Sequence, residues 1–318
     1  MKIVIMGTGA MACLFGARMS EQGNEVWLIS GWKEHVSQIV QNGLTVQEKD
    51  KPSFTVYPRA GLNAAEVLAG DAAYPELVLI SSKGYQTDAA VQKALNIIGP
   101  DTCVLTLQNG IGNADIIAQY VPEDRVFWGS ASVAADLLEL GVVKDATNRN
   151  RSPLISIMPY NKSADERTIH IGNLFQSLGY DTKASCDAEL NIWKKLTINA
   201  CANAVASISQ LPNYIYSNDP DGLILLKQIC AEVCAVAQAK GIKADCDEFS
   251  AYVYKTLHNQ NHYVSMCQDV HNKRQTEIES INGAIVKEGQ KLGVPTPINE
   301  TLLHLVKIIS NHYDERWN

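Results

Sequence analysis

The chain contains 318 residues, of which 46% are hydrophobic and 19% are charged, and its formal net charge is −7. Its length suggests about two domains, and its composition is ordinary for a soluble globular protein. The acidic balance argues against a nucleic-acid partner, because such proteins usually carry a basic patch. No apolar run approaches the ~18 residues that a bilayer span needs, so we expect no membrane partner. A strand rather than a signal peptide opens the chain, and cytoplasmic residence follows as the default.

Short apolar strands alternate with helices in the first half of the chain. The segment 44–57 alternates around a polar turn, which is typical of a hairpin, and a helix at about 163–178 closes this half. Such alternation indicates a mostly parallel sheet with both faces covered by helices. The expected strands lie at 2–6, 24–30, 76–82, 102–108, 125–133, 141–146 and 153–160, and the first two helices at 10–23 and 33–44.

The pattern changes after about Cys186, and no later segment is typical of a strand. We therefore predict an α/β domain over 1–185 and an all-helical domain over 186–318. The expected helices of the second domain lie at 189–209, 219–240, 245–260, 262–291 and 298–315.

The eight cysteines include no C-x-x-C pair, and most lie in apolar segments, where a thiol behaves as a small hydrophobic group. Cys230 and Cys234 share a helix face, but two cysteines without further ligands make a poor zinc site. His258 and His262 also have a spacing that suits a metal, but no H-E-x-x-H motif accompanies them. We therefore expect neither a metal site nor a disulfide.

The segment "GTGAMA" follows the first strand and opens the first helix. It has the form G-x-G-x-x-A, in which the first glycine makes a tight turn and the second lets the backbone approach a pyrophosphate. The helix N-terminus then offers N–H groups to the anion. The alternative is a glycine-rich turn in an ordinary α/β domain. The predicted cofactor-binding residues here are Gly7, Thr8, Gly9, Ala10, Met11 and Ala12.

The end of the second strand selects between NAD and NADP. An acidic residue there would bind the ribose hydroxyl of NAD, whereas a cation favours the phosphate of NADP. This chain has Ser30, Trp32 and Lys33 in that segment and no acid at the strand end. We expect Ser30 and Lys33 to hold the phosphate and Trp32 to cover the adenine, so NADP is the predicted cofactor and NAD the alternative.

Two later strands end in polar residues. "LVLISSKGYQT" carries Lys83, and "VLTLQNGIG" carries Asn109. Ligands of open α/β sheets bind beyond the carboxyl ends of the strands, so these side chains are candidates for contacting the nicotinamide ribose or a carboxylate substrate. The alternatives are a solvated loop lysine and a turn-forming Asn-Gly pair.

The segment "NIWKKLTINACAN" places Lys195, Asn199 and Asn203 four residues apart. Each step of four drifts only about 40° around a helix, so the three side chains form one stripe. We expect this stripe to line a substrate cleft, and we expect Lys194, about 100° away, to face solvent. The alternative is a surface stripe without chemistry.

The predicted helix 262–291 carries Ser265, Asp269 and Glu277. Ser265 and Glu277 would lie about 18 Å apart along such a helix, so they would line different parts of a cleft. The alternative for Glu277 is an exposed residue paired with Lys273 or Arg274 at helical spacing.

With these motifs the chain resembles the ketopantoate reductase (2-dehydropantoate 2-reductase) family over nearly its full length. The resemblance rests on "GTGAMA", "SSKGYQT", "LQNGIG", "IWKKLTINACAN", "LPN" and "SMCQDVHNKRQTEIESINGA". It implies a Rossmann domain followed by a helical domain of the 6-phosphogluconate dehydrogenase type. It also implies reduction of 2-dehydropantoate to pantoate, in pantothenate and coenzyme A biosynthesis, with hydride from NAD(P)H.

The resemblance also implies residue roles. Lys195 matches the catalytic lysine that protonates the ketone oxygen, and Glu277 matches an essential glutamate. The substrate-binding positions implied are Asn109, Asn199, Asn203, Asn213 and Ser265, while Lys83 and Asn109 match residues on the Rossmann side.

The chain departs from the family pattern at Ala12, at Gly31 in place of an arginine, at His262 in place of an asparagine, and over 144–157. Two other functions therefore stay open: a related dehydrogenase for another keto or hydroxy acid, and a dinucleotide-binding sensor without turnover. We expect a small-molecule partner, and the apolar surface of the predicted helices allows a homodimer.

Overall fold

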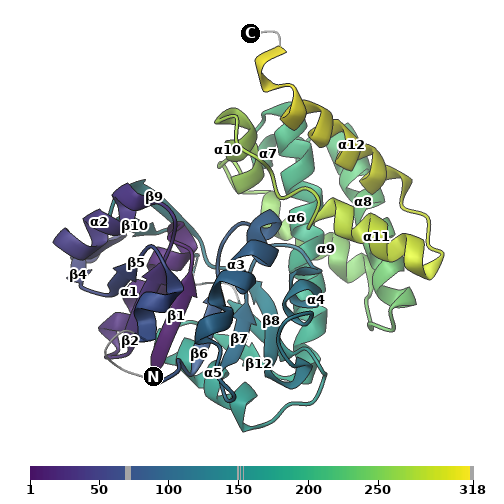
Figure 1. The fold of residues 1–318 in the computed structure, drawn as a ribbon. Helices are drawn as coiled ribbons and strands as arrows, with labels where there is room; N and C mark the ends of the chain where they lie inside the picture. The colour runs from purple at the N-terminus through teal and green to yellow at the C-terminus, as the bar shows by residue number, and fades with distance from the viewer. Residues whose placement is uncertain (69–72, 149, 151, 153, 316–318) are drawn as a thin grey trace. The chain divides into compact units, whose positions relative to one another are not determined.

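The computed structural model describes residues 1–68, 73–148, 150, 152 and 154–315. The chain forms two compact units (Figure 1). Unit 1 contains Met1–Gln108 and Asn113–Glu189, and unit 2 contains Asn109–Gly112 and Leu190–Asn318. The short segment Asn109–Gly112 therefore packs with the helices, although the first domain surrounds it in the sequence.

Unit 1 is built on an eight-stranded sheet of order β12-β11-β8-β7-β6-β1-β2-β5. Every neighbouring pair is parallel except β8 with β11. The predicted α/β class with a mostly parallel sheet is confirmed. The strands are β1 (Lys2–Met6), β2 (Glu25–Ile29), β5 (Arg59–Gly61), β6 (Leu77–Ile80), β7 (Cys103–Thr106), β8 (Val126–Ala131), β11 (Ile155–Pro159) and β12 (Thr182–Ala184).

Apolar side chains on both faces of this sheet are covered by helices. One core joins the sheet to α1 (Ala10–Glu21) and α5 (Glu166–Ser177), where Phe15 meets Phe175 edge to face with ring centroids 5.4 Å apart. The other core contains Ala90 and Val91 of α3 (Thr87–Ala94) and Ile117 of α4 (Asn113–Ile117). Burial on both faces explains why the strands are continuous apolar runs.

A second, four-stranded sheet of order β4-β3-β10-β9 belongs to unit 1 as well. The predicted hairpin forms its antiparallel β3–β4 pair, but its place in a second sheet was not predicted. Buried Arg18 of α1 fastens the small sheet, with ion pairs to Glu48 at 2.7 Å and to Asp145 at 3.3 Å. The strands are β3 (Leu44–Glu48), β4 (Phe54–Val56), β9 (Ala135–Glu139) and β10 (Val142–Asp145). Residue 153, the start of the last predicted strand, and residues 149 and 151 of the divergent segment lie outside the described residues.

Unit 2 consists of helices in its described part. The predicted helix 262–291 is wrong, because the chain between Asn272 and Ile281 is not helical. A short helix that begins at the asparagine of "LPN" was not predicted. The helices are α6 (Glu189–Ser209), α7 (Asn213–Tyr216), α8 (Pro220–Ala239), α9 (Cys246–Leu257), α10 (Ser265–His271), α11 (Asn282–Leu292) and α12 (Pro297–Asn311), while α2 (Lys33–Asn42) belongs to unit 1.

Helix α8 corrects two further expectations. An apolar segment long enough to cross a membrane was not expected, but α8 has that length and a mean hydropathy of 1.5 over 18 residues. Of this 18-residue stretch, 39% is buried, and Ile229 and Val233 belong to the hydrophobic core of unit 2. Cys234 also forms a disulfide with Cys246 of α9. The spacing of 12 residues between these cysteines gave no signal for the bond, because only tertiary packing brings α8 and α9 together.

Candidate functional site

The glycine loop follows β1 at the carboxyl edge of the parallel strands. Gly7 has a φ of +135°, and a Cβ atom there would lie 2.7 Å from the Ser81 carbonyl oxygen. Its N–H donates to the carbonyl of Ile29 at 2.8 Å. The loop therefore lies between the ends of β2 and β6. Its backbone approaches the Ser81 carbonyl so closely that only glycine fits at position 7.

Gly9 has the opposite environment. It precedes the first residue of α1, and a Cβ atom placed on it would have no described neighbour within 4 Å. The space beside Gly9 is therefore open at the N-terminus of α1, where the first N–H groups of a helix have no partner within the helix. Ala12 is fully buried and Thr8 is 3% exposed, whereas Ala10 and Met11 are half-buried. The loop consequently offers mainly backbone groups to a ligand.

The segment after β2 contains the residues predicted to select the cofactor. The Ser30 hydroxyl accepts a hydrogen bond from the backbone N–H of Trp32 at 3.2 Å, and this bond closes a tight turn. Lys33 opens α2 and is exposed, and Trp32 is 43% exposed. The first acidic residue after the strand is Glu34, inside the first turn of α2. The strand end thus presents a hydroxyl, a ring and a cation.

Gln108 connects the ends of β6 and β7 and was missed from the sequence. Its Nε2 donates to the Ser82 carbonyl at 2.8 Å, and its Oε1 accepts from the Thr106 hydroxyl at 2.7 Å. It therefore fixes the backbone directly before half-buried Lys83 and directly before Asn109. An amide at a strand end, next to a residue already singled out, was the available signal.

The predicted stripe lies on α6 in unit 2. Asn199 and Asn203 are 7% and 4% exposed, and Lys195 is half-buried. The Asn203 Oδ1 is buried and has no hydrogen-bond partner among the described residues, which is unusual for an amide oxygen. Lys194, expected to face solvent, instead forms an ion pair with Glu248 of α9.

The loop Asn109–Gly112 contacts both α6 and the chain before α11. Asn199 Nδ2 donates to Asn109 Oδ1 at 3.2 Å. The Ile111 N–H donates to the Ser280 carbonyl at 3.0 Å. Gly110 has a φ of +87°, and a Cβ atom there would lie 1.8 Å from the same Ser280 oxygen. The Asn-Gly pair is therefore a docked turn whose asparagine meets the α6 stripe.

Glu277 lies in the non-helical link between α10 and α11, so the expected 18 Å helical separation from Ser265 does not apply. Glu277 is 8% exposed. Its carbonyl accepts hydrogen bonds from both the N–H and the hydroxyl of Ser280, each at 3.1 Å. Since Ser280 also holds the Asn109 loop, unit 2 joins Asn109, Asn199 and the Glu277 link in one cluster.

The remaining predicted residues differ in their surroundings. Asn213 at the start of α7 is fully buried; its Oδ1 accepts from the Tyr216 hydroxyl at 2.6 Å and its Nδ2 donates to Gln260 at 3.2 Å. Ser265 and His262 are exposed. The amide of Asn213 therefore organises the chain around α7, while Ser265 presents its hydroxyl at the start of α10.

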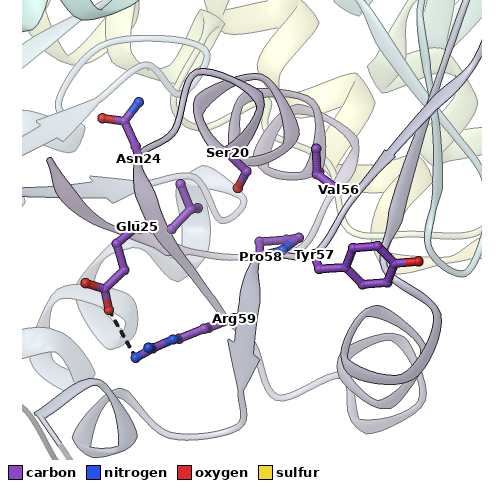
Figure 2. Close-up of a pocket in the computed structure, with 8 residues that line it drawn as sticks. Ser20, Asn24, Glu25, Val56, Tyr57, Pro58 and Arg59 are labelled. Carbon is purple, nitrogen blue, oxygen red and sulfur yellow. Dashed lines mark ion pairs between the residues drawn. The ribbon is translucent and has the colours of Figure 1, made fainter.

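A separate cavity of about 290 Å³ lies at the amino ends of β2 and β5 in the main sheet (Figure 2). It is lined by residues at the start of β2 and β5, where Arg59 pairs with Glu25 at 3.1 Å. β1 and β2 are parallel, so the glycine loop and this cavity lie at opposite ends of the strands. Among the described residues, no three or more His, Cys, Asp or Glu side chains gather as metal ligands.

Comparison with known proteins places both units in one family. Residues 3–151 match the family model for ketopantoate reductase PanE/ApbA, and residues 187–310 match the model for its C-terminal domain. A 2-dehydropantoate 2-reductase of Streptococcus pyogenes serotype M3 is 30% identical over 308 residues, covering 96% of this chain and 97% of the relative.

Solved structures agree with this match. The ternary structure of D-mandelate dehydrogenase with NADH and anilino(oxo)acetate is 30% identical, covers 98% of both chains and has a TM-score of 0.89. A ketopantoate reductase from Ralstonia eutropha JMP134 is 28% identical and has a TM-score of 0.84, covering 98% of this chain and 99% of its own. This chain therefore belongs to the ketopantoate reductase family of oxidoreductases, which act on CH–OH groups and their ketones.

Proposed function

We propose that this protein reduces a 2-keto acid with NAD(P)H, and that the substrate is 2-dehydropantoate, which becomes pantoate. The observation that carries the proposal is the cluster in unit 2, where Asn109 bonds Asn199 and the loop of Asn109 bonds Ser280 beside Glu277. Three distant segments that the family motifs mark as functional meet there. A sensor without turnover would need no such assembly of polar side chains, so we prefer a catalyst.

The cofactor fits the glycine loop of unit 1. Gly9 leaves open space in front of the α1 N-terminus, which favours the pyrophosphate of a dinucleotide. Ser30 and Lys33 supply a hydroxyl and a cation for the additional phosphate of NADP, and Lys83 contacts the ribose side in this proposal. We therefore propose NADP as the cofactor, with residues 1–185 as its binding domain and 186–318 as the substrate domain.

When bound, the reduced nicotinamide supplies the hydride, and the protein supplies the proton and the orientation. Lys195 donates the proton to the ketone oxygen, where negative charge develops as the carbonyl is reduced. Glu277 orients the Lys195 ammonium or the substrate. The substrate accepts amide hydrogen bonds from Asn109, Asn199 and Asn203, and its carboxylate contacts Ser265. Asn213 does not touch the substrate in this proposal but holds the chain near α7 in place.

A second substrate class has specific support. The mandelate dehydrogenase neighbour was solved with NADH and an aromatic oxoacetate, and it matches this chain as well in identity as the curated reductases do. This chain also has exposed His262 where the family places an asparagine, and Gly31 where an arginine is frequent. An aromatic 2-keto acid with NADH is therefore the second candidate.

Initial rates with NADPH and with NADH against a panel of 2-keto acids test the proposal. The panel contains 2-dehydropantoate, phenylglyoxylate, pyruvate and 2-ketoisovalerate. We expect the highest kcat/KM with 2-dehydropantoate and NADPH. A preference for phenylglyoxylate and NADH would favour the second candidate, and dinucleotide binding without turnover on any panel member would favour the sensor.

A further inference from the structure

His35 is a fully buried histidine directly beneath the glycine loop. It lies in the first turn of α2, two residues after Lys33. Its Nε2 is 4.0 Å from Cys13 Sγ of α1, and its ring interacts with the backbone of Thr8. A buried imidazole at this place is not part of the glycine motif and has no role in the proposed chemistry.

Cys13 and His35 both interact with the backbone of Thr8. Cys13 Sγ donates to the Thr8 carbonyl at 3.3 Å, and burial raises the pKa of this thiol to about 12, so the thiol keeps its hydrogen. Burial lowers the pKa of His35, although the Thr8 backbone opposes that change, so the ring is neutral at neutral pH. Its Nδ1 has no partner in the described part of the chain, so we assign the ring hydrogen to Nε2, facing Thr8.

The orientation of this carbonyl determines where the next N–H points. In a trans peptide the C=O and the following N–H point in opposite directions. The hydrogen bond from Cys13 Sγ fixes the orientation of the Thr8 carbonyl, so it also fixes the direction of the Gly9 N–H on the other side of the same peptide. Gly9 precedes the first residue of α1, so a pyrophosphate bound at this helix N-terminus would lie next to that peptide.

The same histidine contacts the segment after β2. The Trp32 ring packs edge to face against the His35 ring, with centroids 4.8 Å apart. Trp32 is 43% exposed and lies between Ser30 and Lys33, which we propose to hold the adenosine phosphate. One buried ring thus interacts with the backbone of the glycine loop and with the indole that we expect to cover the adenine.

We propose that His35 is a positioning residue for dinucleotide binding, which fixes the Thr8–Gly9 peptide and the Trp32 ring together. This inference rests on the proposed function, because it needs unit 1 to bind NADPH or NADH. It predicts that His35 governs cofactor affinity and leaves the proton transfer step to unit 2.

Two variants and one control separate this role from a general effect on folding. His35→Phe keeps a ring beside Trp32 but removes the polar ring nitrogen near Cys13 and the Thr8 backbone, and His35→Gln restores a donor near the former Nε2. The control is Ile39→Ala. Ile39 lies one turn further along α2 and is 1% exposed, so this substitution removes core volume from the same helix. The measurements are calorimetric Kd values for NADPH and NADH, kcat and cofactor KM, and thermal unfolding without cofactor.

We expect His35→Phe to weaken dinucleotide binding about tenfold, which corresponds to about 1.4 kcal/mol, with kcat at saturating cofactor changed less than about twofold. His35→Gln should regain most of the affinity. Ile39→Ala should lower the unfolding temperature while leaving Kd near that of the wild type.

Two results would overturn the inference. Unchanged Kd in His35→Phe would show that the Thr8 contact does not matter for binding. Equal losses of affinity in His35→Phe and Ile39→Ala, at equal losses of stability, would show a purely structural effect. If the wild-type protein binds neither dinucleotide, the proposed function itself fails and this inference fails with it.

Discussion

The two groups of proposed functional residues are built in different ways. In unit 1 the glycine loop offers mainly backbone groups to a ligand, and its key residues are glycines. A side chain on Gly7 would collide with the Ser81 carbonyl, and the absence of a side chain on Gly9 leaves space for a ligand. In unit 2 the cluster around α6 consists of side chains, with Asn199 bonded to Asn109 and Glu277 linked through Ser280. A backbone site is encoded in six consecutive residues, whereas the side-chain cluster needs three segments spread over nearly 170 positions.

This difference predicts different responses to substitution. At the glycine loop, an added methyl group should block a ligand or distort the loop. At α6, removal of a functional group should abolish chemistry without changing the fold.

The largest effect on turnover is expected at Lys195. Lys195→Ala removes the proposed proton donor, and a loss of kcat on the order of 10²–10⁴-fold is typical for a general acid. Lys194→Ala is the matched control, because it removes the neighbouring ammonium, which pairs with Glu248. Steady-state kinetics with saturating cofactor would measure both, and equal kcat losses in the two variants would remove Lys195 from its role.

The docked turn of unit 2 gives the largest expected effect on folding. Gly110→Ala places a methyl group on the Ser280 carbonyl at positive φ, so we expect a loss of about 3 kcal/mol or more in unfolding free energy. Gly112→Ala also has positive φ, at +95°, but meets no described atom within 4 Å, so about 1–2 kcal/mol is expected. Denaturant unfolding compares the two, and a Gly110 variant as stable as the Gly112 variant would contradict the docking.

The glycines of unit 1 should separate folding from binding. Gly7→Ala meets the Ser81 carbonyl at positive φ and should lower the unfolding temperature. Gly9→Ala has room for its methyl group in the protein, so stability should stay within about 0.5 kcal/mol of the wild type. Its methyl group would occupy the space proposed for the pyrophosphate, so NADPH affinity should fall. Calorimetry that finds unchanged NADPH binding in Gly9→Ala would place the cofactor elsewhere.

The smallest expected effect concerns cofactor choice. Lys33→Ala removes the cation next to Ser30 and should raise the KM for NADPH about tenfold, the size expected for one charge-assisted hydrogen bond. The KM for NADH is the internal control and should hardly change. A Lys33 variant with an unaltered NADPH to NADH ratio would assign phosphate recognition to other residues.

Sequence patterns were sufficient where the signal is local. The apolar strands, the glycine loop and helix α6 were predicted from neighbouring residues, and the sheet confirms the α/β class. The long helix over Glu277 was wrong because helical spacing of polar residues does not reveal a break between Asn272 and Ile281. The second sheet, the Cys234–Cys246 bond and the place of Asn109 in unit 2 depend on contacts between distant segments. Such contacts leave no periodic trace in one sequence.

Deuterium transfer from the cofactor tests the proposed reduction of 2-dehydropantoate. The protein would be incubated with 2-dehydropantoate and NADPH carrying deuterium at the transferable position of the nicotinamide, and the product analysed by mass spectrometry and NMR. We expect pantoate with one deuterium on the carbon that bears the new hydroxyl group. Pantoate without deuterium at that carbon would contradict hydride transfer from the cofactor, and no product would contradict 2-dehydropantoate as the substrate.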